Sequence, residues 1–252
     1  MTLNKLLVAA LATTLMTGTA MAVDVKIGVL NDRSGIYADL SGEGSVIAAR
    51  MAVEDFGVAD KGINVEIISA DHQNKPDVAS NIARQWYDTD GVDLIVDVPT
   101  SSAALAVSEV TREKDKIFIN SGAGSTALTG AQCSPNTIHW TYDTYALAKG
   151  TGTAVVERGG KDWFFLTADY AFGHALENDT TAVIKAKGGK VVGGVKHPLN
   201  ASDFSSFLLQ AQASKAQILG LANAGGDTIN AIKAAKEFGI NKSMKMAGLL
   251  VF

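Results

Sequence analysis

Residues 92–107, VDLIVDVPTSSAALAV, decide the fold class of this chain. The apolar run that ends at Val98 has the length of a buried strand, and the run that begins at Ala103 is typical of the first turns of a helix. The junction between them, residues 99–102, consists of one proline and three hydroxyl residues. Such a group either caps the helix or holds a ligand at its N-terminus, and the surrounding sequence has to decide between the two.

Strands and helices alternate on both sides of this stretch. The predicted strands are short apolar runs, at residues 25–30, 65–69, 92–98 and 117–120. Between the first two lies a helix whose Val46, Ala49, Val53 and Phe56 share one face. Parallel neighbours cannot be joined by a tight turn, so this alternation predicts a parallel sheet with right-handed crossovers. Because the strands are rich in Val and Ile without strict alternation, both faces of the sheet should be covered.

A second group of strands and helices follows a break in this rhythm. Residues 121–145 form a loop rich in Gly, Ser and Thr and then a stretch that looks extended from residue 137 to 145. Beyond it the sequence predicts two clear helices, at 171–187 and 227–238, and four strands, near 163–167, 190–196, 217–221 and 245–252. We therefore predict an α/β protein with two doubly wound parallel-sheet lobes, residues 23–141 and 142–252, and a crossing at residues 141–145.

The two ends of the chain carry signals of their own. Lys5, the apolar residues 6–16 and the small-x-small sequence 20–22 are typical of a cleavable signal peptide, the alternative being a buried N-terminal helix. The apolar stretch is shorter than the roughly 20 residues that a membrane span needs. We therefore expect an exported protein that spans no membrane once residues 1–22 are removed. At the other end, residues 248–252 stop within an apolar run, which predicts a truncated chain that binds its ligand poorly.

Composition argues against several classes of protein. Removing Lys5 from the 22 basic residues leaves 21 against 26 acidic ones, a charge of −5 that gives no footprint for nucleic acid. Cys133 is the only cysteine, so an exported form must rely on its core, which 47% apolar residues allow. The four histidines are scattered without the spacing of metal ligands. We expect no metal and no cofactor.

Five strand-to-helix junctions have an unusual composition, and ligands bind at such junctions in open α/β sheets. They are residues 31–44, 99–102, 120–125, 169–173 and 223–227. Hydroxyl groups and free amides at a helix N-terminus suit a carboxylate, and aromatic side chains could bury an apolar body. Plainer explanations exist: Thr100 or Ser102 could cap a helix, the glycines could serve turns, and Tyr170 and Phe172 could lie in the core. The concentration of all five junctions at the same end of the strands favours a pocket for a small acid.

Five motifs at these junctions occur in a fixed order. They are KIGVLNDRSG (26–35) followed by Tyr37, VPTSSAALAVSEV (98–110), FINSGAGS (118–125), DYAFG (169–173) and LANAGGDT (221–228). The ordered set spans residues 24–252 and resembles the periplasmic solute-binding proteins of the branched-chain amino-acid type, which serve ATP-driven (ABC) importers. The resemblance implies the type I periplasmic-binding-protein fold, in which two lobes close on a ligand like a hinged trap.

The resemblance also implies roles for particular residues. Those that would hold the ligand carboxylate are Ser101, Ser102, Ser121, Gly122 and Ala123, with Thr100 beside them. Those that would wall or cap the ligand are Tyr37, Tyr170, Phe172 and Asn223. It implies a monomeric periplasmic protein without a cofactor that delivers a branched-chain amino acid or an aromatic acid to the membrane subunits of an ABC permease. The acidic residue that amino-acid binders use for the ammonium group would lie beyond residue 252, so both ligand classes stay open.

Other functions have weaker support. Gly42 and Gly44 invite a dinucleotide-binding interpretation, but Ile47 occupies the third glycine position, and the sequence has no G-x-S-x-G for a hydrolase. Gly159-Gly160-Lys161 is followed by Asp162 and fails as a P-loop. We therefore expect no enzyme. The alternative is a ligand-sensing domain of a receptor or regulator with the same fold.

Overall fold

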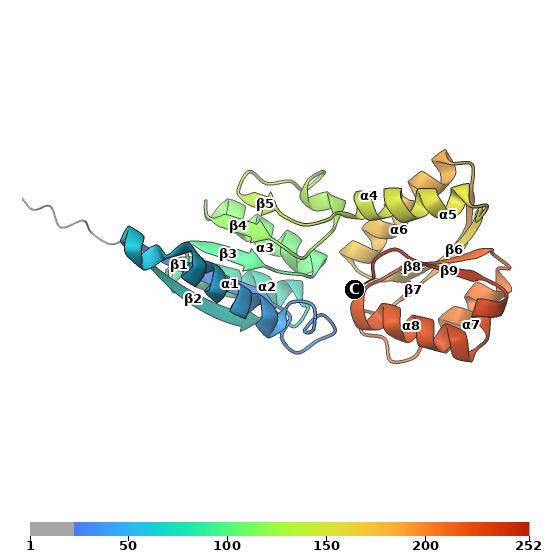
Figure 1. Cartoon of the computed structure of the whole chain (residues 1–252), viewed down its shortest axis with the longest axis horizontal. Helices are drawn as coiled ribbons and strands as arrows, with labels where there is room; N and C mark the ends of the chain where they lie inside the picture. Colours follow the sequence, from blue (N-terminus) through green and yellow to red (C-terminus); the bar gives the residue numbers. More distant parts are fainter. Residues whose placement is uncertain (1–22, 252) are drawn as a thin grey trace, which may run out of the picture.

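The computed structural model describes residues 23–251, in which the chain folds around two parallel β-sheets (Figure 1). Helices lie on both faces of these sheets, which confirms the predicted fold class of two doubly wound parallel sheets. The predicted signal peptide, residues 1–22, lies outside the described residues. Within residues 23–251, none of the helices has the length and apolar character that crossing a bilayer requires.

The first sheet has five strands in the order β2-β1-β3-β4-β5, all paired in parallel. The strands are β1 (Val23–Asn31), β2 (Ile63–Asp71), β3 (Leu94–Asp97), β4 (Ile117–Asn120) and β5 (Thr137–His139). The helices are α1 (Gly42–Phe56), α2 (Pro76–Asp88) and α3 (Ser101–Glu113), with 3₁₀ turns at Val58–Lys61 and Thr126–Leu128. Because the chain moves outward to β2 and then returns past β1 to β3, the order reverses between β1 and β3. In doubly wound sheets the ligand crevice lies at this reversal.

The main core of the first sheet lies under α2 and α3. Leu30, Ile95 and Phe118 on the strands pack with Trp86 of α2 in one buried cluster. Gly28 lets Trp86 lie directly on the sheet, since a Cβ at this position would be 2.4 Å from the indole ring. This contact explains a glycine within a buried strand.

The opposite face of the first sheet is covered less completely by α1. Of the four residues on the predicted apolar face of this helix, Val46 is fully buried, whereas Phe56 is 61% exposed. Ile47 and Met51, one helical turn apart, are also exposed. The apolar periodicity located α1 correctly. How deeply its apolar residues are buried depends on the segments that pack against the helix, and the sequence of the helix carries no information about them.

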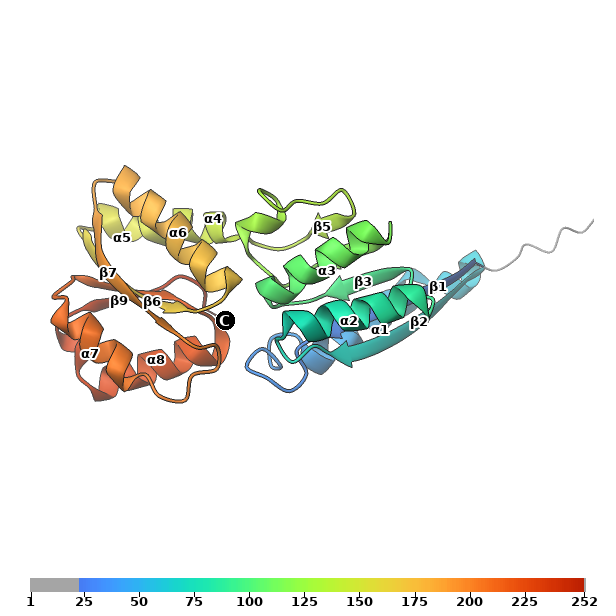
Figure 2. The same ribbon diagram turned by 180° about the vertical axis from the view of Figure 1, so that it is seen from behind.

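The second sheet has four parallel strands in the order β7-β6-β8-β9. The strands are β6 (Asp162–Ala168), β7 (Lys190–His197), β8 (Ile218–Ala222) and β9 (Lys245–Gly248). The helices on one face are α4 (Thr144–Leu147), α5 (Thr153–Glu157) and α6 (Ala171–Ala186), with a π-helical turn (Ala148–Gly152) between α4 and α5 (Figure 2). The helices on the other face are α7 (Ser205–Ala213) and α8 (Gly225–Glu237). A 3₁₀ turn (Ile240–Lys242) follows α8 in the chain. The order again reverses beside the first strand, between β6 and β8.

Two sequence predictions are wrong in their extent. The last strand was predicted over residues 245–252, but β9 ends at Gly248, and Leu249 and Leu250 pack into a core shared with α6. The stretch 137–145 was predicted to be extended, but α4 already begins at Thr144. In both cases the stretch contains apolar or β-branched residues that are not part of a strand. A local sequence pattern cannot distinguish such residues from those of a strand.

Candidate ligand-binding site between the two sheets

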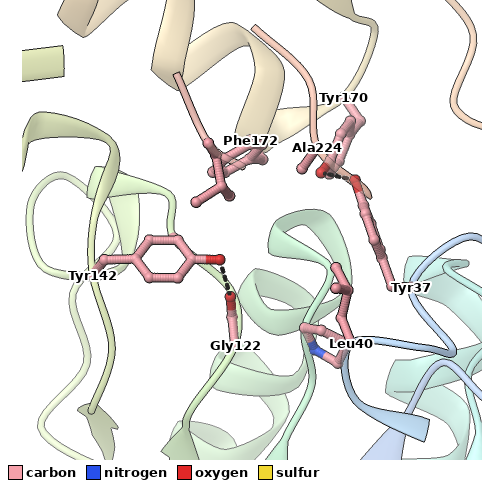
Figure 3. A pocket seen from close by; sticks show the side chains of 10 residues that line it. Tyr37, Leu40, Gly122, Tyr142, Tyr170, Phe172 and Ala224 are labelled. Atoms are coloured by element: carbon pink, nitrogen blue, oxygen red, sulfur yellow. Dashed lines mark hydrogen bonds between the residues drawn. The ribbon is translucent and has the colours of Figure 1, made fainter. Parts of the chain in front are cut away.

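A small cavity of about 30 Å³ lies where the carboxyl ends of the two sheets face each other (Figure 3). Its lining comes from the segments that follow β1, β3 and β4, from the connection between the sheets, and from the segments that follow β6, β8 and β9. These residues are Tyr37, Leu40, Pro99, Gly122, Gly124, Tyr142, Tyr170, Phe172, Ala224 and Leu250. A volume of this size holds one or two water molecules. A larger ligand therefore needs more space than the cavity provides in this arrangement of the two halves.

Two tyrosines join the two halves directly. The hydroxyls of Tyr37, from the β1–α1 loop, and Tyr170, from the β6–α6 junction, form a hydrogen bond of 2.6 Å (Figure 3). Burial raises the pKa of both phenols, so both hydroxyls stay protonated at neutral pH. Only one of the two protons is needed for the bond between them. The pair can therefore donate a further hydrogen bond to an acceptor in the cavity.

A third tyrosine lies on another side of the cavity. Tyr142 follows β5 in the connection between the sheets, and its hydroxyl points at the Gly122 carbonyl, with an O···O distance of 3.5 Å (Figure 3). This distance makes a weak hydrogen bond. Burial raises the pKa of the Tyr142 phenol to about 12, so it too is a neutral donor.

Helix N-termini from both halves meet at the cavity. The backbone amide of Ala171, the first residue of α6, donates to the Ser102 hydroxyl in the first turn of α3 at 3.3 Å. The N-cap side chains of α3, α6 and α8 make no capping hydrogen bond, so in the described part of the chain the first-turn amides other than that of Ala171 keep their donor capacity. The partial positive charges of these termini favour an anion in the gap between the halves.

Several of the predicted site residues lie at this gap. Tyr37, Gly122, Tyr170 and Phe172 line the cavity, and Ser102 makes the contact with α6 described above. Phe172 packs beside Tyr170 with ring centroids 6.1 Å apart, so the two form one aromatic wall. The tertiary structure thus brings together residues that are more than 130 positions apart in the sequence.

Two predicted residues in the same junction as Ser102 are occupied elsewhere. The buried Thr100 is the N-cap residue of α3, but its hydroxyl donates to the side-chain oxygen of Asn74 instead of capping the helix. The Ser101 hydroxyl accepts a hydrogen bond of 3.2 Å from the backbone amide of Ser125. Neither residue lines the cavity.

Three further predicted residues do not line the cavity either. Asn223 lies inside the second half, where its amide contacts His197 at 3.1 Å and Thr228 at 2.7 Å. The amide of Ala123 donates to the Asn120 side chain at 2.9 Å. The Ser121 hydroxyl donates to a carboxylate oxygen of Asp97 at 3.2 Å.

Six of the lining residues are not among the predicted site residues. Pro99, Gly124, Ala224 and Leu40 stand within junctions that were singled out, but they carry no polar group that would draw attention. Tyr142 lies in the predicted crossing, and Leu250 in a stretch assigned to a strand. The signal that could have identified most of these residues is their position just after a strand, and not their residue type.

The end of β3 has an uncommon backbone conformation. Asp97 and Val98 both have positive φ, at 81° and 58°, which a β-branched residue rarely adopts. The buried Asp97 carboxylate accepts from Asn31 at 3.2 Å as well as from Ser121, and burial raises its pKa. Strain of this kind persists where surrounding contacts enforce it, and here it precedes the junction that carries Pro99 and Ser102.

Among residues 23–251 there is no cluster of three or more His, Cys, Asp or Glu side chains that could hold a metal ion. Thr167 and Glu177 pair at 2.8 Å, and His174 pairs with Asp169 at 2.7 Å, but these groups lie within the second half and do not line the cavity. What the cavity offers is neutral hydroxyls, backbone amides and apolar surface.

Comparison with known proteins identifies relatives of this arrangement. A family model described as periplasmic binding protein matches residues 24–252. The Leu/Ile/Val-binding protein homolog 6 of Brucella melitensis biotype 1 is 25% identical over 255 residues, which cover 99% of this chain and 63% of the relative. The chain thus spans less than two thirds of the length of the curated relatives that it matches.

Solved structures with the same fold extend the comparison. A periplasmic binding protein from Burkholderia mallei is 62% identical, with a TM-score of 0.87 over 91% of this chain and 61% of the other. A branched chain amino acid ABC transporter periplasmic ligand-binding protein from Burkholderia xenovorans is 40% identical, with a TM-score of 0.71 over 88% and 60%. A solute binding protein of an ABC transporter from Rhodopseudomonas palustris BisB5, in complex with 3,4-dihydroxybenzoic acid, is 25% identical, with a TM-score of 0.77 over 88% and 61%.

Proposed function

The chain belongs to the periplasmic binding protein family, and from this premise we propose that it is the solute-binding component of an ABC importer. In this proposal the cavity between the two sheets is the ligand site. The protein captures a small carboxylate in the periplasm and delivers it to the membrane subunits of a permease. The family consists of binding proteins, which agrees with the expectation that the chain is no enzyme.

The observation that carries the proposal is the meeting of Tyr37 and Tyr170. Each follows the first strand of its sheet at the point where the strand order reverses, and the two hydroxyls lie 2.6 Å apart. Ligands of doubly wound sheets bind at this reversal, so two such points that face each other make one composite site.

The magnitudes indicate what such a site needs. An anion at a helix N-terminus gains roughly 0.3 to 2 kcal/mol, whereas micromolar affinity corresponds to about 8 kcal/mol. Burying the body of the ligand against aromatic side chains such as Tyr37, Tyr170 and Phe172 can contribute about 1.5 to 3 kcal/mol for each side chain. A ligand with one carboxylate and an apolar body therefore suits the site.

We propose that binding works by closure of two lobes, residues 23–141 and 142–252. The connection between β5 and α4, residues 140–143, would act as a hinge. The ligand can touch both lobes only when they are closed, so its contacts favour the closed form over the open one. The cavity is lined from both halves and is small in this arrangement, which supports a site whose size changes as the lobes move.

Two classes of ligand fit this description. The name of the Brucella relatives points to Leu, Ile or Val, and the Rhodopseudomonas protein holds an aromatic acid. Within residues 23–251, the lining of the cavity carries no acidic side chain that could pair with an ammonium group. Because the chain spans less than two thirds of its relatives, hydroxybenzoates and branched-chain amino acids both belong among the first compounds to test.

Titration calorimetry on the complete gene product tests the proposal. We expect one ligand per protein from a panel of aromatic acids and branched-chain amino acids, and an affinity about tenfold lower for Tyr170→Phe and for Ser102→Ala, since each loses about one hydrogen bond. Tyr145→Phe, which alters an exposed tyrosine outside the cavity, is the control. Tight binding that neither Tyr170→Phe nor Ser102→Ala weakens would reject this site.

A further inference from the structure

Three loops of the first sheet are joined by a chain of buried and partly buried hydrogen bonds. It begins at Asp32, which is fully buried just after β1. One carboxylate oxygen of Asp32 accepts from the backbone amide of Gly35 at 2.8 Å, and the other accepts from the backbone amide of Tyr37 at 2.8 Å. The second oxygen also accepts from the side-chain amide of Asn74 at 2.6 Å. Asp32 thus fixes the backbone that carries Tyr37.

The chain continues through Asn74 to the start of α3. Asn74 lies in the β2–α2 loop with a φ of 57°, a conformation that asparagine tolerates better than most residues. Its side-chain oxygen accepts from the hydroxyl of Thr100, the N-cap residue of α3. Asn74 therefore uses both ends of its amide group, one toward the Tyr37 loop and one toward α3.

Gly35 shows how closely this network is packed. A Cβ at Gly35 would lie 2.6 Å from the Asn74 side-chain nitrogen and 2.7 Å from a carboxylate oxygen of Asp32. Because no side chain fits there, the loop can approach the two polar groups closely. Buried polar groups are stable only when their hydrogen bonds are satisfied, so each member depends on the others.

We propose that Asp32, Asn74 and Thr100 are positioning residues of the ligand site. None of them lines the cavity, and they act by holding two groups that do reach the second lobe: Tyr37, which contacts Tyr170, and the first turn of α3, whose Ser102 contacts Ala171. The proposal deepens the function proposed above and rests on it for its consequence for ligand affinity. It also explains why Thr100 stands in a hydroxyl-rich junction without facing the cavity.

A ligand-free experiment tests the positioning itself. Amide hydrogen exchange is measured by NMR at Tyr37, whose amide donates to Asp32, and at Ala171, whose amide donates to Ser102. In Thr100→Val we expect exchange at both amides to become roughly tenfold faster, although Tyr37 lies in another loop and Ala171 in the other lobe. Asp32→Asn should produce the same pair of changes from the opposite end of the network.

Thr111→Val is the matched control. Thr111 lies on the same helix, is also fully buried and also uses its hydroxyl, which donates to the Val107 carbonyl at 2.8 Å. The Thr111→Val variant should be less stable than the wild type but should show unchanged amide exchange at Tyr37 and Ala171. Thr100→Ser, which keeps the hydroxyl, should show the wild-type exchange rates. If Thr100→Val speeds exchange only near residue 100, or if Thr111→Val has the same effect, the positioning role is wrong.

Affinity separates this inference from the proposed function. With 3,4-dihydroxybenzoate or L-leucine as the probe, Thr100→Val should raise Kd about tenfold in the wild-type background but less than about threefold in an Asp32→Asn background, because the two changes break the same network. Additive effects would contradict the network. If neither probe binds, the exchange experiment still decides the positioning role, and only the choice of ligand fails.

Discussion

Neighbouring residues of one type have different tasks in this protein, according to what lies opposite each of them. Thr100 and Ser102 are both hydroxyl residues of the junction after β3, yet the first turns back to Asn74 and the second faces α6. The same contrast holds for the tyrosines. Tyr37 and Tyr170 meet at the cavity, whereas Tyr87 donates to the Ile117 carbonyl in the core of the first sheet at 3.0 Å. Residue type defines what a group can do, and its surroundings define what it does.

One buried residue gives the stability a defined dependence on pH. His72 is fully buried, and burial lowers its pKa to about 4, although Asp32 and Asp71 partly oppose the shift. Its Nδ1 accepts a hydrogen bond of 3.0 Å from the backbone amide of Asn74. Because the unfolded chain takes up this proton near pH 6.5 and the folded one only near pH 4, the folded state is favoured above pH 6.5 and loses this advantage as the pH falls toward 4.

We therefore expect the free energy of unfolding to fall by up to about 3 kcal/mol between pH 6.5 and 4 on account of His72. Urea titrations at pH 7 and pH 4.5 measure this loss. His72→Gln removes the titrating group and should flatten the difference, whatever its effect at pH 7. An unchanged pH dependence in His72→Gln would exclude this origin.

The helices contribute to the site through their first turns. α3, α6 and α8 each begin at a strand end near the cavity, and the side chains of their own N-cap residues make no capping hydrogen bond. The first residue of α8, Gly225, has a φ of 56°, and a Cβ there would lie 3.2 Å from the ring of Tyr37. The glycine thus serves both the backbone conformation at the helix start and the approach of a loop from the other sheet.

Gly225→Ala should therefore weaken the contact between the two halves. We expect it to lower the free energy of unfolding by about 1 kcal/mol or more, because alanine is strained at this φ, and to reduce ligand affinity because Tyr37 is displaced. Gly226→Ala, one residue further on, is the matched control, since a Cβ there meets only Ile36 at 3.8 Å. Thermal unfolding and calorimetry compare the two. Equal effects of both variants would show that helix propensity alone is responsible.

The relation between the two sheets depends on contacts at the connection as well as at the cavity. Asp179 of α6 accepts from the hydroxyls of Thr126, at 3.0 Å, and Thr144, at 2.6 Å. Thr126 belongs to the segment after β4, and Thr144 is the first residue of α4. One carboxylate therefore joins the first half, the connection and the second half beside the proposed hinge.

Thr126→Val removes one of these hydrogen bonds without changing the size of the side chain. We expect the ligand-free protein to open, with a larger radius of gyration in small-angle X-ray scattering, and the ligand to bind several-fold more weakly, since a hydrogen bond to a charged group contributes about 1.5 to 3 kcal/mol. Thr129→Val, whose hydroxyl donates only to the nearby Thr126 carbonyl, is the control. A wild-type radius of gyration in Thr126→Val would remove Asp179 from the closure mechanism.

The sequence by itself determined the α/β class and the parallel sheets, and it predicted a candidate site at the strand ends, where the cavity lies. These features follow from the spacing of apolar residues and from turn chemistry, which act between residues close together in the chain. The predicted Tyr37, Ser102, Tyr170 and Phe172 lie at the gap for the same reason: each stands just after a strand, and parallel strands bring their carboxyl ends to one edge.

Only the tertiary structure decided which side chains reach the cavity and which support it. Leu250 lines the cavity and is not part of the strand that was predicted for it, and the side chain of Asn223 points inward to His197. Thr100 became part of a network with Asn74 and Asp32, which stand 26 and 68 residues before it in the sequence. The direction of a polar side chain is set by the partner that satisfies its hydrogen bonds, and these partners come from loops and strands that are distant in the sequence, so no local pattern records their approach.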